Sequence, residues 1–317
     1  MRLSILLPLL AALSFLSLFV GVSPLSPADL LSLTPDQQEL LRISRLPRLA
    51  SLIIAGMSLS IAGLIMQQLS RNKFVSPSTA GTMEAAGLGL LVSLLLFDSA
   101  GMLVKMAISF GFALAGTLVF MRMLDRIKFK DAVFIPLVGL MFGGVLASLT
   151  TFFAYRYDLI QSIGSWMQGS FTGVMQGRYE LLYISVPATL LAYAFASRFT
   201  IAGMGEDFAL NLGLSYRKIV NLGLVLVALI SSSIILTVGV IPFLGLIVPN
   251  LVSIFRGDNL KKNLPVTAVF GAVFVLACDI LGRVLIHPYE LPISLIVGVL
   301  GSVIFLYLLL RRDAYAG

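Results

Sequence analysis

The chain has few residues of the kinds that build metal centres, disulfide frameworks or water-facing surfaces. Its 317 residues include one cysteine and one histidine, Cys278 and His287, which excludes a disulfide framework and a conventional Cys/His metal site. Only 12% of the residues are charged, whereas a soluble globular domain carries about a quarter. So few charges cannot cover the surface of a soluble protein of this length. We therefore expect lipid surroundings and no chemistry at Cys278 or His287.

Long apolar runs dominate the sequence, which is 58% hydrophobic with a mean hydropathy of +1.01. A helix needs about 20 apolar residues to cross the hydrocarbon core, and ten runs approach this length. The first run is longer than the roughly 7–15 residues of a signal-peptide core, so we interpret it as a retained span. The eighth is short and contains Pro242 and Pro249, which favours a bent or broken helix. The predicted spans are 3–22, 49–69, 82–99, 102–122, 132–154, 180–197, 219–238, 242–256, 265–286 and 291–310.

The basic residues form short clusters between the apolar runs. The net charge of +7 could suggest a nucleic-acid partner, but such clusters are typical of membrane topology signals. With both chain ends inside, 15 of the 22 basic residues are cytoplasmic and the sequence forms one all-α transmembrane domain over 1–317. The cytoplasmic set is Arg2, Arg71, Lys73, Arg122, Arg126, Lys128, Lys130, Arg198, Arg217, Lys218, Arg256, Lys261, Lys262, Arg311 and Arg312. The outer set is Arg42, Arg45, Arg48, Lys105, Arg156, Arg178 and Arg283.

One polar stretch, AGMGEDFALNLGLSYRK at 202–218, lies between the sixth and seventh spans on the predicted cytoplasmic side. Residues 205–212 have the length of about two helical turns, and Gly213 is placed as a C-terminal stop. The stretch could be a solvated connector. Alternatively, because it mixes apolar residues such as Phe208 with acidic ones, it could dock into a groove of another protein.

Four segments resemble, in order along the chain, the permeases of ABC importers for iron siderophores, haem and cobalamin. The pattern Gly-x-Gly-Glu-x-x-Ala-x-x-Leu-Gly at 203–213 is similar to the ATPase-coupling loop of that family. Residues 44–81 contain its Arg-Leu-Pro-Arg and Gln-x-x-x-Arg-Asn motifs around the second span. Residues 239–265 resemble its Phe-x-Gly-Leu-x-x-Pro block, and residues 278–312 resemble its C-terminal signature.

The resemblance implies a cobalamin-importer-like permease fold with about ten transmembrane helices in the bacterial cytoplasmic (inner) membrane. Two permease subunits, either two copies or a pair of related paralogues, form a pathway that two cytosolic ABC ATPases drive. An extracytoplasmic binding protein delivers the cargo. The chain is then a transport subunit and not an enzyme, and it lacks a G-x-x-x-x-G-K-[ST] phosphate loop. It is expected to bind no cofactor, since ATP and Mg²⁺ belong to the ATPase and iron travels only inside the siderophore.

The matched motifs also imply site residues. Arg45, Arg48 and Arg283 match arginines that the family presents to acidic residues of the binding protein. Alternatively, Arg45 and Arg48 anchor the second span at the interface, and Arg283 forms an i, i+4 ion pair with Asp279. The residues expected to couple to the ATPase are Gly203, Gly205, Glu206, Ala209, Leu212 and Gly213.

Four further residues are expected along the translocation pathway. Thr82, Met83 and Glu84 lie in the segment that corresponds to the narrow cytoplasmic end, where the family usually has a small polar residue in place of Glu84. The Glu84 carboxylate could interact with a positive group on the cargo, or it could be a helix-start charge favoured by the helix dipole. Trp166 matches a Trp-x-x-Gly-Ser region near the outer mouth, or it belongs to an interfacial aromatic belt.

Sequence details such as RNKFVSPSTAGTM resemble permeases for catechol-type ferric siderophores, namely enterobactin, vibriobactin, petrobactin and anguibactin. Haem and cobalamin are the alternative cargoes. The main rival class is a secondary transporter driven by an ion gradient, which needs an acidic residue near the bilayer midplane. Asp279 and Glu84 are the acidic candidates, and the predicted spans place neither at the centre.

Overall fold

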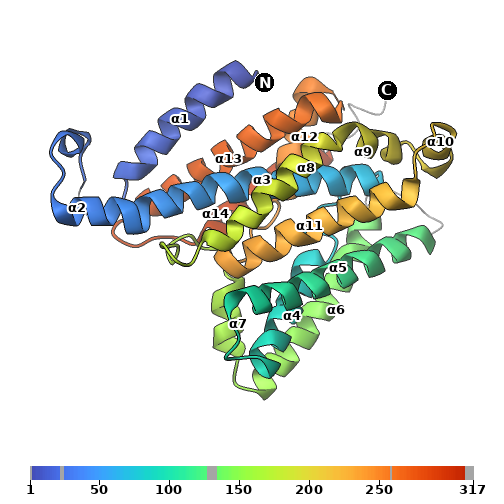
Figure 1. The fold of residues 1–317 in the computed structure, drawn as a ribbon, viewed down its shortest axis with the longest axis horizontal. Helices are drawn as coiled ribbons and strands as arrows, with labels where there is room; N and C mark the ends of the chain where they lie inside the picture. Colours follow the sequence, from blue (N-terminus) through green and yellow to red (C-terminus); the bar gives the residue numbers. More distant parts are fainter. Residues whose placement is uncertain (1, 22–24, 127–133, 258, 311–317) are drawn as a thin grey trace.

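The computed structural model describes residues 2–21, 25–126, 134–257 and 259–310, and these residues form helices and loops without a β-strand (Figure 1). The bundle is elongated, with α2 at one end and α10 at the other, and we refer to the α2 end and the α10 end. The helices are α1 (Leu3–Phe19), η1 (Pro27–Leu31), α2 (Pro35–Leu40), η2 (Leu41–Arg45), α3 (Leu46–Ser70), α4 (Thr82–Leu96), α5 (Met102–Arg126), α6 (Phe134–Arg156), α7 (Ile160–Met167), η3 (Glu180–Ile184), α8 (Ser185–Ala194), α9 (Ala196–Gly203), α10 (Glu206–Asn211), α11 (Tyr216–Val238), α12 (Leu244–Arg256), α13 (Leu260–Val284) and α14 (Ile293–Leu310).

The predicted all-α, multi-pass architecture is confirmed, since each predicted span contains an apolar helix. By length and composition, the described part of the chain has five helices that could cross a membrane: the continuous stretch Pro35–Ser70, α5, α6, α11 and α13. Glu180–Ala194 and Ala196–Gly203 form a sixth crossing if this pair, bent by 64°, counts as one span. Four apolar helices are shorter: α1, α4, α12 and residues Ile293–Tyr307 of α14. The start of the predicted span 132–154 and the basic residues Lys128, Lys130, Arg311 and Arg312 lie outside the described residues.

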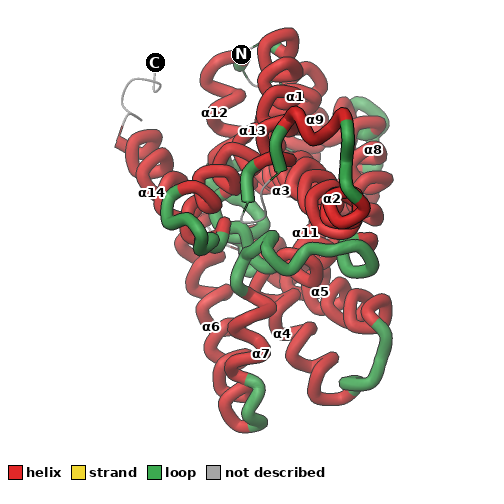
Figure 2. The backbone as a smooth tube through the Cα atoms, turned by 90° about the vertical axis from the view of Figure 1, so that its left-hand side faces the viewer, coloured by secondary structure: helices red, strands yellow, loops and turns green. Residues whose placement is uncertain are grey.

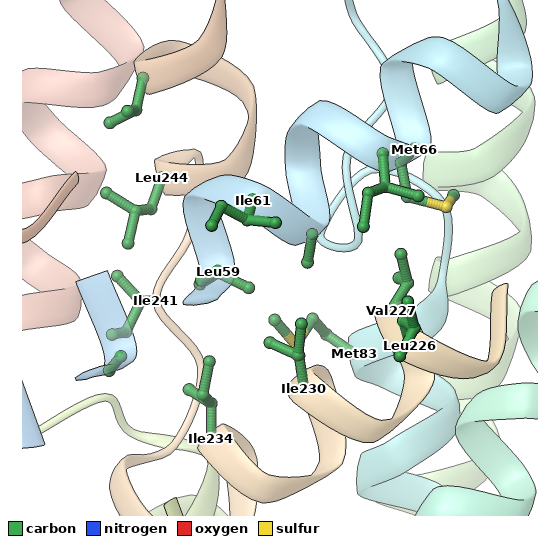
Figure 3. Close-up of a cluster of buried hydrophobic side chains, with 14 of the residues drawn as sticks. Leu59, Ile61, Met66, Met83, Leu226, Val227, Ile230, Ile234, Ile241 and Leu244 are labelled. Atoms are coloured by element: carbon green, nitrogen blue, oxygen red, sulfur yellow. The ribbon is translucent and has the colours of Figure 1, made fainter. Parts of the chain in front are cut away.

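Helix α3 runs through the centre of the bundle. Figure 3 shows Leu59 and Met66 of α3 facing Ile230 of α11 and Leu244 of α12, and each of these side chains is at most 1% exposed. Figure 2 is seen from the α2 end. It shows α4, α6 and α7 on one side of α11, whereas α12 and α13 lie on the opposite side of α11. Helix α3 packs directly against α13, α12 and α11, and α11 in turn packs against α4 and α5.

Small residues allow α3 to approach its neighbours closely. A Cβ atom added to Gly63 would lie 1.8 Å from the carbonyl oxygen of Gly245 in α12. A Cβ atom on Gly271 of α13 would lie 2.4 Å from the carbonyl oxygen of Gly56. Lipid tails are as apolar as the helix surfaces, so helix association in a membrane depends on this kind of close packing. The glycines at these two crossings therefore let α3 pack directly against α12 and α13.

The chain folds back into the bundle between α3 and α4. Residue Arg71 ends α3 in a left-handed conformation (φ 52°), and residues 72–81 then run inward. A Cβ atom on Gly139 of α6 would lie 2.0 Å from the carbonyl oxygen of Thr79, and one on Gly116 of α5 would lie 2.5 Å from the Cβ of Ala85. Gly116 lies ten residues before the end of α5, which is about 15 Å along the helix. Helix α4 therefore starts near half depth, and its short length follows from this start.

Candidate functional site

The polar stretch predicted to couple to an ATPase forms a separate short helix at one tip of the bundle. Helix α10 covers Glu206–Asn211 and projects at the α10 end (Figure 1). Gly205 precedes it with φ 124°, and Gly213 follows it with φ 73°. The N–H of Gly213 donates to the carbonyl of Leu210 at 2.9 Å, and that of Leu214 donates to the carbonyl of Ala209 at 2.9 Å. This pair of bonds is a Schellman motif, so the predicted glycine stop is confirmed.

Large apolar side chains around α10 face outward. Phe208, Leu210 and Leu212 are 46%, 56% and 58% exposed, and Met204 is 60% exposed. Glu206 is also exposed, whereas Ala209 is completely buried against the bundle. A helix with a buried small residue and an exposed apolar and acidic surface is suited to docking in a groove. This geometry favours the docking interpretation over the solvated connector.

Two of the predicted coupling residues contact the end of α3. A Cβ atom on Gly203 would lie 3.0 Å from the carbonyl oxygen of Gln68, and a Cβ atom on Gly205 would lie 3.4 Å from Nη1 of Arg71. Lys73, which follows Arg71, donates from Nζ to the hydroxyl of Ser253 in α12 at 3.3 Å. The α10 end therefore brings together the coupling segment and the ends of α3 and α12.

A charged cluster lies at the opposite, α2 end. Asp279 accepts from Arg48 with its Oδ1 atom at 2.8 Å and pairs with Arg283 through its Oδ2 atom at 2.8 Å. Arg48 also donates to Glu290 at 2.8 Å. The i, i+4 pair of Asp279 and Arg283 that the sequence predicted is confirmed, and its two side chains are 3% and 2% exposed. Opposite charges at these distances make buried arginines tolerable near the membrane edge.

Arg45 and Arg283 use their remaining donors to hold the end of α1. Arg283 donates to the carbonyl of Ser17 at 3.0 Å, to its hydroxyl at 2.6 Å and to the carbonyl of Val20 at 2.7 Å. Arg45 donates to the carbonyls of Leu18, at 3.2 Å, and Val20. Carbonyls at a helix C-terminus have no partner within the helix, and guanidinium groups complement their partial negative charge. The two arginines therefore cap α1 from neighbouring helices.

These positions leave little arginine surface for a binding protein. Arg45 is 7% exposed and Arg283 is 3% exposed, while the side chain of Arg48 is 12% exposed. A docking arginine has to reach a carboxylate on another molecule. Intramolecular capping and ion pairing account for all three residues in this conformation, and a docking role for them stays a prediction.

Glu290, in the loop before α14, links the charged cluster to a second loop. Its Oε2 atom accepts from the hydroxyl of Thr172 at 2.8 Å as well as from Arg48. Burial alone would raise the pKa of Glu290, but the charge of Arg48 and the hydrogen bonds from Thr172 and Arg48 outweigh it and hold the pKa below its ordinary value. The sequence analysis did not single out Glu290 or Thr172. Glu290 lies only seven residues after Arg283, which is the one signal that could have suggested it.

Two of the predicted pathway residues lie inside the subunit. Met83 is 1% exposed and belongs to the cluster around α3 and α11 (Figure 3). Thr82 is completely buried, and its hydroxyl is hydrogen-bonded to that of Thr117 in α5 at 2.8 Å. Neither side chain lines an open passage in this conformation.

Glu84 points towards α6 instead. A Cβ atom on Gly143 would lie 3.2 Å from the carboxyl carbon of Glu84. Gly143 is nine residues into α6, which is about 14 Å along a helix, compared with a hydrocarbon core of about 30 Å. Glu84 therefore lies near the middle of α6 and not beside one of its ends, because the chain returns into the bundle before α4 begins. The Oε2 atom is buried and has no hydrogen-bond partner among the described residues.

Trp166 lies where α7 ends, at the α2 end of the bundle. It packs against the small cluster that contains Leu90, Met106 and Leu236. The following backbone joins two other segments, since Ser170 donates to the carbonyl of Val238 at 2.8 Å and Ser294 donates to that of Gly169 at 3.1 Å. Trp166 also lines a cavity of about 930 Å³ between the ends of α5, α7 and α11.

Among the described residues, no three His, Cys, Asp or Glu side chains are grouped together. The candidate functional features are two surfaces and the half-buried acid Glu84. The coupling segment and the charged cluster occupy opposite ends of the bundle, and Glu84 lies between them at half depth.

Comparisons with known proteins show the family of the chain. The profile of the FecCD transport family matches residues 9–311. The chain is 61% identical to the petrobactin import system permease protein YclN of Bacillus subtilis, over 100% of both chains. It is 43% identical to the ferric-anguibactin transport system permease protein FatD of Vibrio anguillarum, over 84% of this chain and 85% of the relative.

A solved structure has the same fold. It is described as an inward-facing conformation of a metal-chelate type ABC transporter, and it superimposes with a TM-score of 0.80 at 24% identity. The superposition covers 96% of this chain and 97% of that chain. At this identity the similarity concerns the fold alone.

Proposed function

Since the chain belongs to the FecCD transport family, we propose that it is the membrane-spanning subunit of an ATP-driven importer for a catechol-type ferric siderophore. It is a transport subunit rather than an enzyme. In this proposal, ATP is hydrolysed by a cytosolic ABC ATPase dimer, and an extracytoplasmic binding protein delivers the siderophore. The complex would lie in the bacterial cytoplasmic membrane with a second permease subunit.

The exposed coupling helix is the observation that carries the proposed energy source. Helix α10 presents Phe208, Leu210 and Leu212 at the α10 end while Ala209 anchors it to the bundle. A gradient-driven carrier has no need for such an apolar projection outside the bilayer. Glu84 at half depth is the one feature that suits the rival class, but its Oε2 atom has no partner that would relay a proton among the described residues.

The choice of cargo is supported by the two relatives whose names specify petrobactin and ferric-anguibactin. Both names denote iron-carrying siderophores, and the first relative is similar over the full length of the chain. Haem and cobalamin remain the cargoes to test against them. The choice between a second copy and a related paralogue as partner subunit needs a separate test, and co-purification of differently tagged permeases would provide it.

Reconstitution tests both the energy source and the cargo. The permease is placed in liposomes with its ATPase and binding protein, and uptake of ferric petrobactin, ferric anguibactin, haem and cobalamin is measured with and without ATP. We expect ATP-dependent uptake of a ferric siderophore. Uptake by vesicles that contain the permease but no ATPase would contradict the proposal.

A matched pair of variants tests the coupling helix. Phe208→Asp should weaken ATPase association by about 2 kcal/mol, which is roughly 30-fold in Kd, because an aromatic anchor at a protein interface typically contributes this much. Asn211→Ser changes an exposed polar residue of the same helix and should leave association unchanged. Equal affinities of both variants and the wild type would rule out α10 as the docking element.

A further inference from the structure

The contact between the coupling segment and α3 suggests a route for movement into the membrane. Gly203 and Gly205 flank the bend before α10 and lie close to the end of α3, since a Cβ atom added to them would lie 3.0 Å from the carbonyl oxygen of Gln68 and 3.4 Å from Nη1 of Arg71. Arg71 is exposed, and none of the ion pairs among the described residues that are given above includes it. At Gly203 even one methyl group would be only 3.0 Å from the Gln68 carbonyl. A displacement of the bend therefore pushes directly on the end of α3.

The segment after Arg71, residues 72–81, is held together by its own hydrogen bonds. Asn72, Ser76 and Thr79 are at most 5% exposed. The Oδ1 atom of Asn72 accepts from the N–H of Phe74 at 2.8 Å, and the hydroxyl of Thr79 accepts from the N–H of Ser76 at 2.9 Å while donating to the carbonyl of Phe74 at 3.1 Å. Satisfied internal hydrogen bonds make a short buried segment rigid. Residues 72–81 can therefore transmit a displacement without absorbing it.

Residues 72–81 lie between α12 on one side and α6 on the other. A Cβ atom on Gly245 of α12 would lie 3.3 Å from Pro77. On the other side, one on Gly139 of α6 would lie 2.0 Å from the Thr79 carbonyl. The segment continues directly into α4, where Glu84 lies against Gly143 of the same α6 helix. The coupling segment (residues 203–213), residues 72–81 and Glu84 therefore form a continuous series, in which each part lies against the next or is joined to it along the chain.

Glu84 gives this route a preferred direction. Its Oε2 atom is buried without a hydrogen-bond partner in the described part of the chain, and an unsatisfied buried polar atom destabilises the state that contains it. Glu84 as a whole is half-buried, so a separation of α4 from α6 would further change the surroundings of its carboxyl group. The contact at Gly143 is therefore the place where a movement of α4 relative to α6 is felt by Glu84.

We propose that Arg71 and Gln68 are positioning residues that transmit movement of the coupling segment through residues 72–81 to the contact between Glu84 and α6. This inference rests on the proposed function, because it requires an ATPase docked at α10. Arg71 does not contact the cargo in this scheme. Arg71 fixes the distance between the coupling segment and residues 72–81.

The variant Arg71→Asn tests this role, since asparagine tolerates the left-handed conformation of residue 71 and lacks the guanidinium group. Lys261→Gln is the matched control, because it removes an exposed cation near the same end of the bundle. Both are reconstituted with the ATPase and the binding protein. The measurements are ATPase association, ATP hydrolysis and siderophore imported per ATP.

A labelling assay reports the far end of the route directly. The single cysteine is removed as Cys278→Ala, and Phe142→Cys is introduced in α6, where residue 142 is half-buried against Gly81 and Glu84 is kept. A water-soluble maleimide is then added with and without ATP. Arg71→Asn should retain ATPase association, but it should lower import per ATP and the ATP-dependent increase in labelling by about 5-fold or more, the lower end of usual coupling between sites. Lys261→Gln should match the wild type in both measurements.

Three results separate the possible failures. If Arg71→Asn imports and labels like the wild type, the route through α3 is wrong. If Arg71→Asn loses ATPase association, Arg71 belongs to the docking surface and the inference is again wrong. If the unmodified complex shows no ATP-dependent uptake, the proposed function fails, and the labelling result then has no bearing on it.

Discussion

Asp279 balances two buried arginines, so its neutralisation should be among the most destabilising single changes in the bundle. It lies 2.8 Å from both Arg48 and Arg283, and it is 4% exposed. At an effective dielectric constant of about 20, two unit charges at this distance attract by about 6 kcal/mol. Measured losses for breaking a buried pair are about 3–5 kcal/mol, because the remaining charge stays buried. We expect Asp279→Asn to lower the stability by an amount in this range.

The assay is thermal inactivation in detergent, followed as the fraction of protein that elutes as a monodisperse peak after heating. Glu39→Gln removes an exposed acid at the same end and should behave as the wild type. The double variant Asp279→Leu with Arg283→Met should recover only part of the loss. It avoids the unpaired charge of Arg283, but it removes the hydrogen bonds of Arg283 to the end of α1 and leaves Arg48 paired with Glu290 alone. If Asp279→Asn melts at the wild-type temperature, the charge balance at the α2 end contributes nothing to stability and our account of the cluster is refuted.

Two further changes test other parts of the structure. Burial alone would raise the pKa of Glu290, but chiefly the charge of Arg48 holds the pKa below its ordinary 4.5. The ionised form of Glu290 therefore contributes stability above about pH 4.5, and this contribution is lost as the pH falls through the lowered pKa. Glu290→Gln should flatten the acid limb of a melting-temperature profile, and an unchanged limb would contradict this assignment. In Gly63→Ala the new methyl group would lie 1.8 Å from the carbonyl oxygen of Gly245. Typical overpacking costs about 1–3 kcal/mol, and because this clash is with rigid backbone we expect the bundle to lose more stability than that. Gly144→Ala, which meets nothing within 4 Å, is the control, and equal melting temperatures would show that α3 and α12 can separate freely.

The coupling helix was largely predictable from the sequence because its signals are local. A glycine before and after seven residues, with acidic residues in the first turn, specifies a short capped helix whatever surrounds it. The apolar runs were equally clear, because the length of a span depends on the thickness of the bilayer and not on neighbours. The i, i+4 pair of Asp279 and Arg283 also follows from helix geometry alone.

The depth of Glu84 could not be predicted in the same way. A hydropathy window sees residues 82–99 as one apolar run and assigns it a full crossing. The inward course of residues 72–81 depends on glycines in three other helices, among them Gly139 and Gly245, that leave room for it. The roles of Arg45 and Arg48 likewise depend on partners far along the chain, the carbonyl oxygens of Leu18 and Val20 for Arg45 and the carboxylates of Asp279 and Glu290 for Arg48.

The sequence by itself determined that this protein is a membrane-embedded helical bundle with a capped apolar helix outside the lipid. Composition, run length and local capping do not depend on the rest of the fold. Only the tertiary structure decided that the arginines hold α1 and pair with two acids, and that a carboxylate lies unsatisfied at half depth. Those features arise where segments distant in sequence exclude water together, and the energy of a buried charge depends on which groups surround it.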